Sequence, residues 1–208
     1  MWRPGIGRPD QSSPECLQKR PGTKVGEFYR CIRTDFVGYE KFESSAKILS
    51  IVDEQGNNIE IARNGVFDII LDKTPFYAES GGQIGDSGEI ISENGEKHTV
   101  YNTFKVNKVY IHQTEGAFKV GDKVSAKINL QKRKECEKHH SLAHFLQSAL
   151  IKVLGDEVHQ AGSFVEDNRT RFDFTFPRAM TKEEVQEVED IINAWIDEDI
   201  EQNTEVMN

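Results

Sequence analysis

The sequence predicts an α+β protein in which a small antiparallel β-barrel is followed by an α/β core. Short strand-like segments separated by Gly and Asn turns fill most of residues 31–130. An apolar period of three and four residues, typical of amphipathic helices, begins after residue 130 and recurs near the end of the chain. A strand pair lies between these two helical segments, so we expect a barrel over 31–130 and the core over 131–208.

The composition fits a folded protein that works inside the cell. Of the 208 residues, 37% are hydrophobic and 29% are charged, which is enough apolar material for a core. No apolar run approaches the roughly 18 residues of a membrane span, and the start has no signal-peptide core. An odd count of three cysteines (Cys16, Cys31 and Cys136) argues against a disulfide scaffold. We therefore expect a cytoplasmic protein.

Residues 1–30 differ from the rest of the chain. They contain four of the six prolines and six Lys or Arg against three Asp or Glu, without a helical or strand period. We expect a flexible or unrelated leader and assign it no function.

The barrel prediction comes from strand-like segments at spacings of 8 to 15 residues. Residues 46–53 are apolar on both faces near the centre, as in a buried strand, and a Gln-Gly-Asn-Asn turn follows them. The expected strands cover 46–53, 59–61, 66–71, 88–92, 98–106, 109–112 and 123–128.

The core prediction begins with a helix over about 135–154, which Gly155 ends. A strand pair follows over 159–165 and 171–176, with Phe172, Phe174 and Phe176 on one face. Thr181 and Glu184 form a capping-box pattern that opens a second helix. The expected core face of that helix is Val185, Val188, Ile191, Ile192, Trp195 and Ile196.

His140 and His144 are the sharpest chemical signal. Imidazoles four residues apart on a helix share one face and can both bind a Zn²⁺ ion at about 2.0–2.1 Å. Two ligands do not complete a zinc site, and on spacing alone ordinary surface or capping histidines are the more common explanation. Cys136 lies on the same helical face as the two histidines but too far along the helix axis to bind one ion together with both of them. His159 could approach the pair only through folding.

A glycine-rich loop over residues 74–88 is the second signal. Its glycines permit positive φ and close backbone approach, so the loop can direct N–H groups at an anion or carbonyl oxygen. A barrel turn with bulges is the alternative. The third signal, Gln160-Ala161-Gly162-Ser163, carries little information alone.

Two basic sets interrupt a chain whose net charge is −9. Local Lys and Arg are what phosphate binding needs, although a solvated surface is an equal explanation for each set. The first set is Lys132, Arg133, Lys134 and Lys138, and the second is Arg169, Arg171, Arg178 and Lys182.

Taken in order, the motifs closely resemble the editing region of alanyl-tRNA synthetases over about residues 34–208. The free-standing alanyl-tRNA editing proteins and the editing domain of threonyl-tRNA synthetase share that hydrolytic fold. The resemblance rests on Asp35-Phe36-Val37-Gly38-Tyr39, FYAESGGQIGDSG, HHSLAHFLQSAL, QAGSFV, RFDF and the closing TEVMN.

The resemblance implies a site that hydrolyses seryl or glycyl esters of the alanine tRNA. His140 and His144 would supply two zinc ligands, and a downstream Cys-x-x-x-His the other two. The glycine-rich loop and Gln160 would surround the mischarged terminal adenosine, while the first basic set would contact tRNA phosphates. The loop residues implied are Gly81, Gly82 and Gln83.

Two departures from the family pattern set expectations for this chain. No downstream Cys-x-x-x-His precedes Asn208, and Ala143 stands where the family commonly has Thr. We therefore expect the first part of a truncated editing core, without an aminoacylation domain, that binds zinc weakly and edits little. Three functions remain open: an editing enzyme, a catalytically incomplete tRNA- or synthetase-binding module, and a different metal hydrolase that recruits Cys136 or His159.

Overall fold

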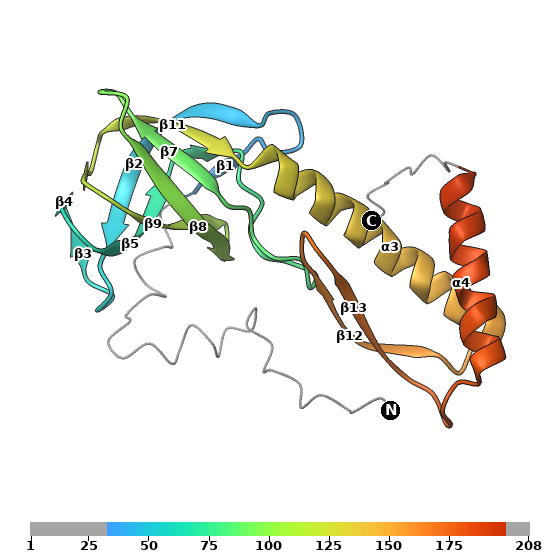
Figure 1. Ribbon diagram of the computed structural model, residues 1–208. Coiled ribbons are helices and arrows are strands. Elements are labelled where there is room, and N and C mark those ends of the chain that lie inside the picture. The colour runs from blue at the N-terminus through green and yellow to red at the C-terminus, as the bar shows by residue number, and fades with distance from the viewer. Residues whose placement is uncertain (1–32, 199–208) are drawn as a thin grey trace. The chain divides into compact units, whose positions relative to one another are not determined.

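The computed structural model describes residues 33–198 (Figure 1). The expected leader over 1–30 and the closing TEVMN motif lie outside these residues. The chain divides into two compact units between Arg133 and Lys134, near the boundary expected at residue 130. Within the described range, no helix is both long enough and apolar enough to cross a membrane.

The first unit is a closed antiparallel barrel. Its strands follow the order β11-β7-β8-β9-β5-β2, and β2 pairs with β11 to close the ring (Figure 1). The sequence prediction of a small antiparallel barrel is confirmed. The strands of the ring are β2 (Glu43–Val52), β5 (Val66–Leu71), β7 (Gly88–Ser92), β8 (Lys97–Val106), β9 (Val109–Glu115) and β11 (Lys123–Ile128).

Short strands complete the barrel at its ends. β1 (Asp35–Phe36) pairs in parallel with β6 (Lys73–Thr74). The single strand expected over 59–61 is two strands, because β3 (Asn58–Ile59) pairs with β2 and β4 (Ile61–Ala62) pairs with β10 (Phe118–Lys119). The chain changes partner at Glu60, which an alternating pattern alone does not reveal.

The barrel interior combines an apolar core with one buried polar network. Ile48, Ile69 and Leu71 are fully buried, as the two-sided apolar pattern of these strands predicts. His112 is also fully buried; its Nδ1 lies 3.0 Å from the Ile69 carbonyl and its Nε2 2.7 Å from Thr74 Oγ1. A carbonyl only accepts, so Nδ1 carries the proton and the Thr74 hydroxyl donates to Nε2.

Helix α3 (Leu130–Leu154) begins earlier than the expected residue 135. Asn129 Oδ1 accepts a hydrogen bond from the Lys132 N–H at 3.1 Å, as a helix N-cap does. The helix ends where predicted, at Gly155, whose φ of 92° suits a glycine at the position after a helix.

The rest of the second unit is a hairpin and a helix. Strands β12 (His159–Val165) and β13 (Thr170–Thr175) pair antiparallel, and α4 (Lys182–Asp197) follows. The capping box is present: Thr181 Oγ1 accepts from the Glu184 N–H, and the Glu184 carboxylate accepts from the Thr181 N–H. These elements match the sequence prediction.

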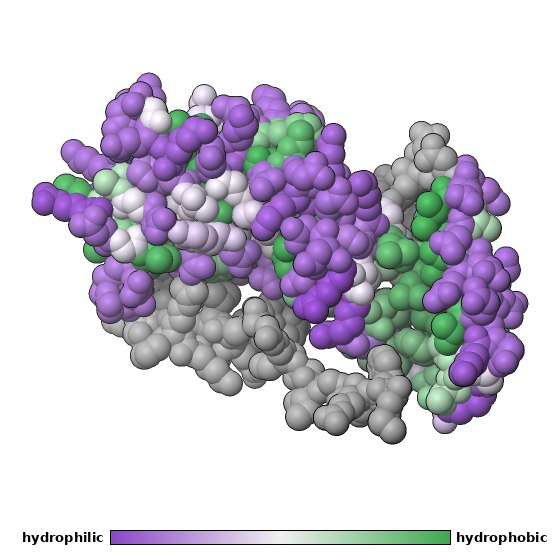
Figure 2. Space-filling view, in the orientation of Figure 1, coloured by the Kyte–Doolittle hydropathy of each residue, from purple (hydrophilic) through white to green (hydrophobic). Residues whose placement is uncertain are grey.

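The core face of α4 is narrower than expected. Val188 and Ile192 are buried, and Ile191 and Trp195 pack against the same cluster. Val185 and Ile196 were expected in the core but are 43% and 52% exposed, because, up to residue 198, only α3 and one hairpin of this unit are available to cover the helix. In Figure 2, apolar residues gather on the inner side of α4 while its outer side is hydrophilic.

Candidate functional site

His140 and His144 lie together on α3, as their spacing predicts. Their ring centroids are 5.1 Å apart and the ring planes are tilted by 33°. His140 is half-buried and His144 is exposed, so the pair stands where the helix surface meets solvent. The two imidazoles therefore lie side by side on one face of the helix.

The surroundings of the pair keep His140 neutral. Burial, and then the neighbouring His144, hold the pKa of the His140 imidazole below its ordinary value of 6.5. Neutral imidazole is the form that ligates a metal. Ala143, in the turn between the histidines, is buried.

The pair brings two possible metal ligands together. Across residues 33–198, no set of three His, Cys, Asp or Glu side chains is placed to hold one metal ion. Cys136, one turn before His140, is 4% exposed, and His159 lies exposed on β12. Neither therefore completes a site with the pair in this part of the chain.

The glycine-rich loop contains a tight turn at its tip. Ser80 and Gln83 exchange backbone hydrogen bonds of 3.2 and 3.0 Å across Gly81 and Gly82. The φ angles of Gly81 and Gly82 are 59° and 81°, the left-handed values that a two-residue hairpin turn needs at both central positions. Gly81 is exposed and Gln83 is buried. The turn therefore presents backbone, rather than side chains, to solvent.

The body of this loop is packed against β8. The Glu79 N–H donates to the Thr103 carbonyl at 2.9 Å, and the Thr103 hydroxyl donates to the Asp86 carbonyl at 3.0 Å. Gly85 lies so close to β8 that a Cβ there would be 1.9 Å from the Thr103 oxygen. The glycines thus serve both alternatives raised by the sequence, a barrel turn and an exposed backbone bend.

Arg133 lies beneath the loop and not on the surface. It is 5% exposed, and its Nε lies 3.0 Å from both carboxylate oxygens of Asp86. Its Nη1 donates to the Gly38 carbonyl and its Nη2 to the Pro75 carbonyl, each at 3.0 Å, and Nη2 also contacts Asp86. These contacts use the guanidinium inside the barrel unit, so we remove Arg133 from the set expected to meet tRNA phosphates.

No motif or spacing in the sequence indicates the Arg133–Asp86 pair. Asp86 also accepts a hydrogen bond of 2.8 Å from the Tyr77 N–H, so its carboxylate joins both ends of the loop to α3. The partners lie 47 residues apart with no shared motif. Only the closure of the barrel brings them together.

Gln160 lies on β12, opposite Phe174 of β13, and is exposed. A bulge follows it, because the register shifts between Gln160 and Gly162. Bulges reorient side chains and are common beside functional sites. Among the described residues, Gln160 forms no hydrogen bond with either imidazole of the pair.

The basic sets differ in their partners. Lys132, Lys134 and Lys138 are exposed on α3, and Lys138 contacts Glu135 at 2.9 Å. In the second set, each arginine forms an ion pair with a carboxylate at 3.0 Å or less. This pairing favours the interpretation of the second set as ordinary solvated surface over that of a phosphate-binding set. These ion pairs are Arg169–Glu166, Arg171–Asp173 and Arg178–Glu184.

The candidate residues are distributed over both units. The glycine-rich loop and Arg133 belong to the barrel unit, and the histidine pair and Gln160 to the second unit. Within the second unit, the Thr170 hydroxyl donates to the His139 carbonyl at 2.8 Å. This bond fixes the start of β13 beside the turn that carries the pair.

Comparison with known proteins identifies the family. Residues 12–132 match the family of class II (A) tRNA synthetases. The chain is 43% identical over 175 residues to an alanine–tRNA ligase of Sulfurovum sp. (strain NBC37-1), covering 84% of this chain and 20% of that protein. It is 42% identical over 181 residues to that of Wolbachia pipientis wMel, covering 85% and 21%. It is also 47% identical over 165 residues to that of Helicobacter pylori (strain ATCC 700392 / 26695), covering 77% and 19%.

The matched region therefore makes up most of this chain and a small part of each relative. The chain spans about a fifth of the length of the curated alanine–tRNA ligases it matches. The family match covers more than half of the 208 residues and includes the barrel strands and the glycine-rich loop. On this basis, the chain belongs to the class II (A) family of tRNA synthetases.

Proposed function

We propose that this chain is part of the editing region of an alanine–tRNA ligase and acts in the cytoplasm in the hydrolysis of Ser or Gly esters mistakenly formed on the alanine tRNA. The observation that carries the proposal is the histidine pair, with rings 5.1 Å apart, in a chain 43% identical to an alanine–tRNA ligase. The ordered motifs of the sequence support the editing region in particular.

His140 and His144 are the residues that would hold zinc. Their donor chemistry fits that ion, since both are imidazoles and burial keeps His140 in the neutral state that ligates. When bound in such a site, zinc polarises an ester carbonyl or makes hydroxide available at neutral pH. The pair's own contribution is to fix two ligands on one rigid helix.

The barrel unit would hold the end of the tRNA. Within the barrel unit, the Gly81–Gly82 turn would offer exposed backbone to the terminal adenosine. In the second unit, Gln160 would orient the aminoacyl ester. Lys132, Lys134 and Lys138 would contact phosphates, which fixes position and not identity. Arg133 would act indirectly, because it holds the loop from beneath.

A second function, tRNA binding without turnover, is favoured by one observation. Two imidazoles are brought together, and no third metal-ligating side chain joins them within residues 33–198. Two ligands hold zinc weakly compared with the three or four of known sites. We therefore propose that the 208-residue chain binds tRNA and contributes half of a metal site, with little or no editing by itself.

Zinc content and deacylation of Ser-tRNA(Ala) separate the two functions. Both are measured on the 208-residue chain and on a chain extended beyond Asn208 with the corresponding segment of a relative. The editing proposal predicts turnover at least in the extended chain, and its loss on His144→Ala. Tight zinc and full turnover in the shorter chain would reject the binding-only function. Absence of turnover in both chains would reject editing.

A further inference from the structure

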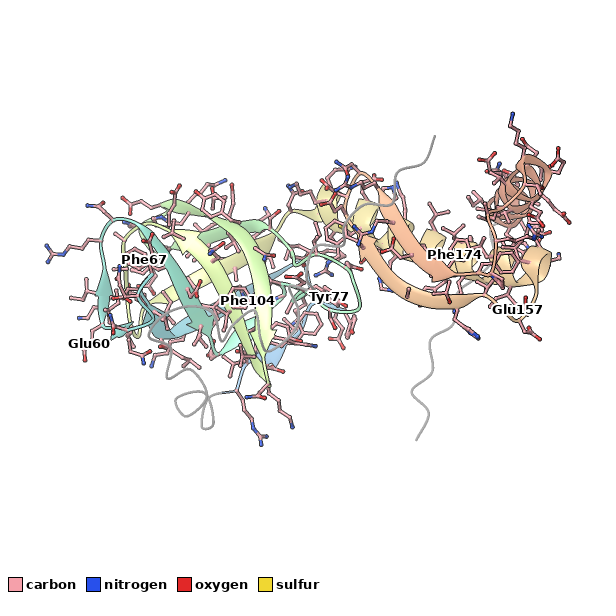
Figure 3. All side chains as sticks on the ribbon, turned by 90° about the horizontal axis from the view of Figure 1, so that it is seen from below. Glu60, Phe67, Tyr77, Phe104, Glu157 and Phe174 are labelled. Carbon is pink, nitrogen blue, oxygen red and sulfur yellow. The ribbon has the colours of Figure 1, made fainter. Side chains whose placement is uncertain are left out.

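An aromatic surface closes one end of the barrel. The ring of Phe36 stacks on Tyr110, with centroids 5.2 Å apart and planes within 5°, and meets the edges of Tyr39 at 5.1 Å and Tyr77 at 6.5 Å. Tyr39 is 85% exposed, the largest exposure among the described large hydrophobic residues. Tyr77 lies at the opposite end of the barrel from Glu60 (Figure 3). We call Phe36, Tyr39, Tyr77 and Tyr110 the aromatic surface.

Exposed aromatic rings are usually mobile, but here the backbone on both sides is fixed. The carbonyl of Gly38, next to Tyr39, accepts from the buried Arg133, and the Tyr77 N–H donates to Asp86. A Cβ at Gly38 would lie 2.3 Å from the Pro75 carbonyl oxygen, so the turn carrying Tyr39 is pressed against the start of the loop. The same ion pair therefore positions both tyrosines, which reduces the entropy lost when a ligand stacks on them.

Three lysines lie near residues of the aromatic surface, one across a strand ladder and two along the chain. Lys105 lies directly across the β8–β9 ladder from Tyr110, Lys108 precedes that tyrosine by two residues, and Lys41 follows Tyr39 by two. None of these lysines forms an ion pair with a carboxylate within residues 33–198. Asp35, Glu40 and Glu79 are the acidic neighbours along the chain. Lys105 and Lys108 are both exposed and give the Tyr110 side of the aromatic surface a local positive charge, which suits an anionic ligand with flat rings.

The aromatic surface also adjoins the glycine-rich loop. Tyr77 belongs to that loop and precedes Ser80, the first residue of the Gly81–Gly82 turn, by three residues. A strand lying across the rings would therefore lead directly to the exposed backbone of that turn. Single-stranded nucleic acids are bound in this way, with bases stacked on aromatic rings and phosphates near lysines.

We propose that the aromatic surface binds the unpaired 3′ end of an RNA, with one base stacked on the exposed face of Tyr39 and phosphates beside Lys105 and Lys108. This inference rests on the proposed function, because it assumes a tRNA ligand. It adds a binding surface that neither the histidine pair nor the glycine-rich loop provides. Its position beside Ser80 makes it the approach to the loop for a single strand.

The test uses the full chain and two RNA hairpins that mimic an acceptor stem. One hairpin carries an unpaired ACCA end with 2-aminopurine replacing the first of its two adenines, because the terminal adenosine is assigned to the Gly81–Gly82 turn, and the other is blunt. Stacking on Tyr39 quenches the 2-aminopurine fluorescence. Tyr39→Ala should weaken binding of the overhang hairpin about tenfold and restore the fluorescence, and should leave blunt-hairpin affinity unchanged. Tyr39→Trp, which keeps a stacking face, should preserve both signals.

Tyr101→Ala is the matched control, because Tyr101 is also an exposed barrel tyrosine, 48% accessible, away from Phe36. Equal effects of Tyr39→Ala and Tyr101→Ala, or equal losses for both hairpins, would overturn the inference while leaving tRNA binding intact. In that case, the exposed ring would be assigned to a protein contact. Failure of the chain to bind either hairpin would reject both this inference and the tRNA-binding part of the proposed function.

Discussion

Arg133 illustrates why the role of a single residue depends on partners remote in sequence. It stands between Lys132 and Lys134 in a basic run, and composition alone suggests a surface for phosphates. In the structure, the neighbouring lysines are exposed and Arg133 turns inward to Asp86. A planar guanidinium can bind a carboxylate and two carbonyls at once, which a lysine ammonium cannot do with the same geometry.

Replacing Arg133 with Met should destabilise the barrel unit. The substitution leaves the Asp86 carboxylate buried without its counter-ion, and breaking one side of a buried pair costs about 3–5 kcal/mol. Urea unfolding of Arg133→Met and of the exposed control Lys134→Met measures the difference. The control should stay within about 0.5 kcal/mol of the natural chain. Equal stability of the two variants would show that the buried pair does not hold the loop.

His112 should make the stability of the barrel depend on pH. Burial lowers the pKa of its imidazole to about 4, whereas the unfolded chain has the ordinary 6.5. Between these values the unfolded state binds more protons, so stability decreases as the pH falls from about 6.5 to about 4. The slope from this residue is at most about 1.4 kcal/mol per pH unit.

Urea unfolding between pH 4 and pH 7.5, compared for the natural chain and His112→Gln, isolates this contribution. The other five histidines are common to both proteins, so their titration cancels in the difference. We expect a shallower pH dependence in the variant. Identical slopes would mean that His112 titrates alike in the folded and unfolded states, contrary to its burial between Thr74 and Ile69.

At the scale of elements, the sequence predicted what local pattern controls. Alternation and turn residues located each strand of the ring, and the capping box located α4. Non-local contacts decided the rest: Glu60 divides one expected strand because its neighbours pair with different partners, and Asn129 starts α3 early. The exposure of Val185 reflects how little of the second unit covers α4.

The glycine-rich loop allows a prediction that compares two of its glycines. Gly85→Ala should disrupt packing on β8, because its Cβ would meet the Thr103 backbone at 1.9 Å. Gly81→Ala has open space around the new Cβ and should cost only about 1–2 kcal/mol from its φ of 59°. Thermal unfolding of both variants orders the effects. A larger loss for Gly81→Ala would contradict the placement of the loop on β8.

At the scale of the whole molecule, the order of the motifs was enough to identify the family. It was not enough to predict how the candidate site residues are arranged. The histidine pair is local to one helix, so its spacing was sufficient to predict that its rings meet. Gln160 is different, because a strand bulge decides where its side chain points. The aromatic surface joins residues from β1, the loop and β9, a combination that only barrel closure produces.

Zinc titration of the full chain by calorimetry at pH 7 tests the central claim most directly, namely that His140 and His144 form one half of a metal site. We predict weak binding of one zinc per chain that falls at least tenfold on His140→Ala or His144→Ala. His159→Ala and Cys136→Ala should leave the affinity unchanged, since neither side chain joins the pair. Zinc affinity that is indifferent to His140→Ala, or that is lost on Cys136→Ala, would contradict the account.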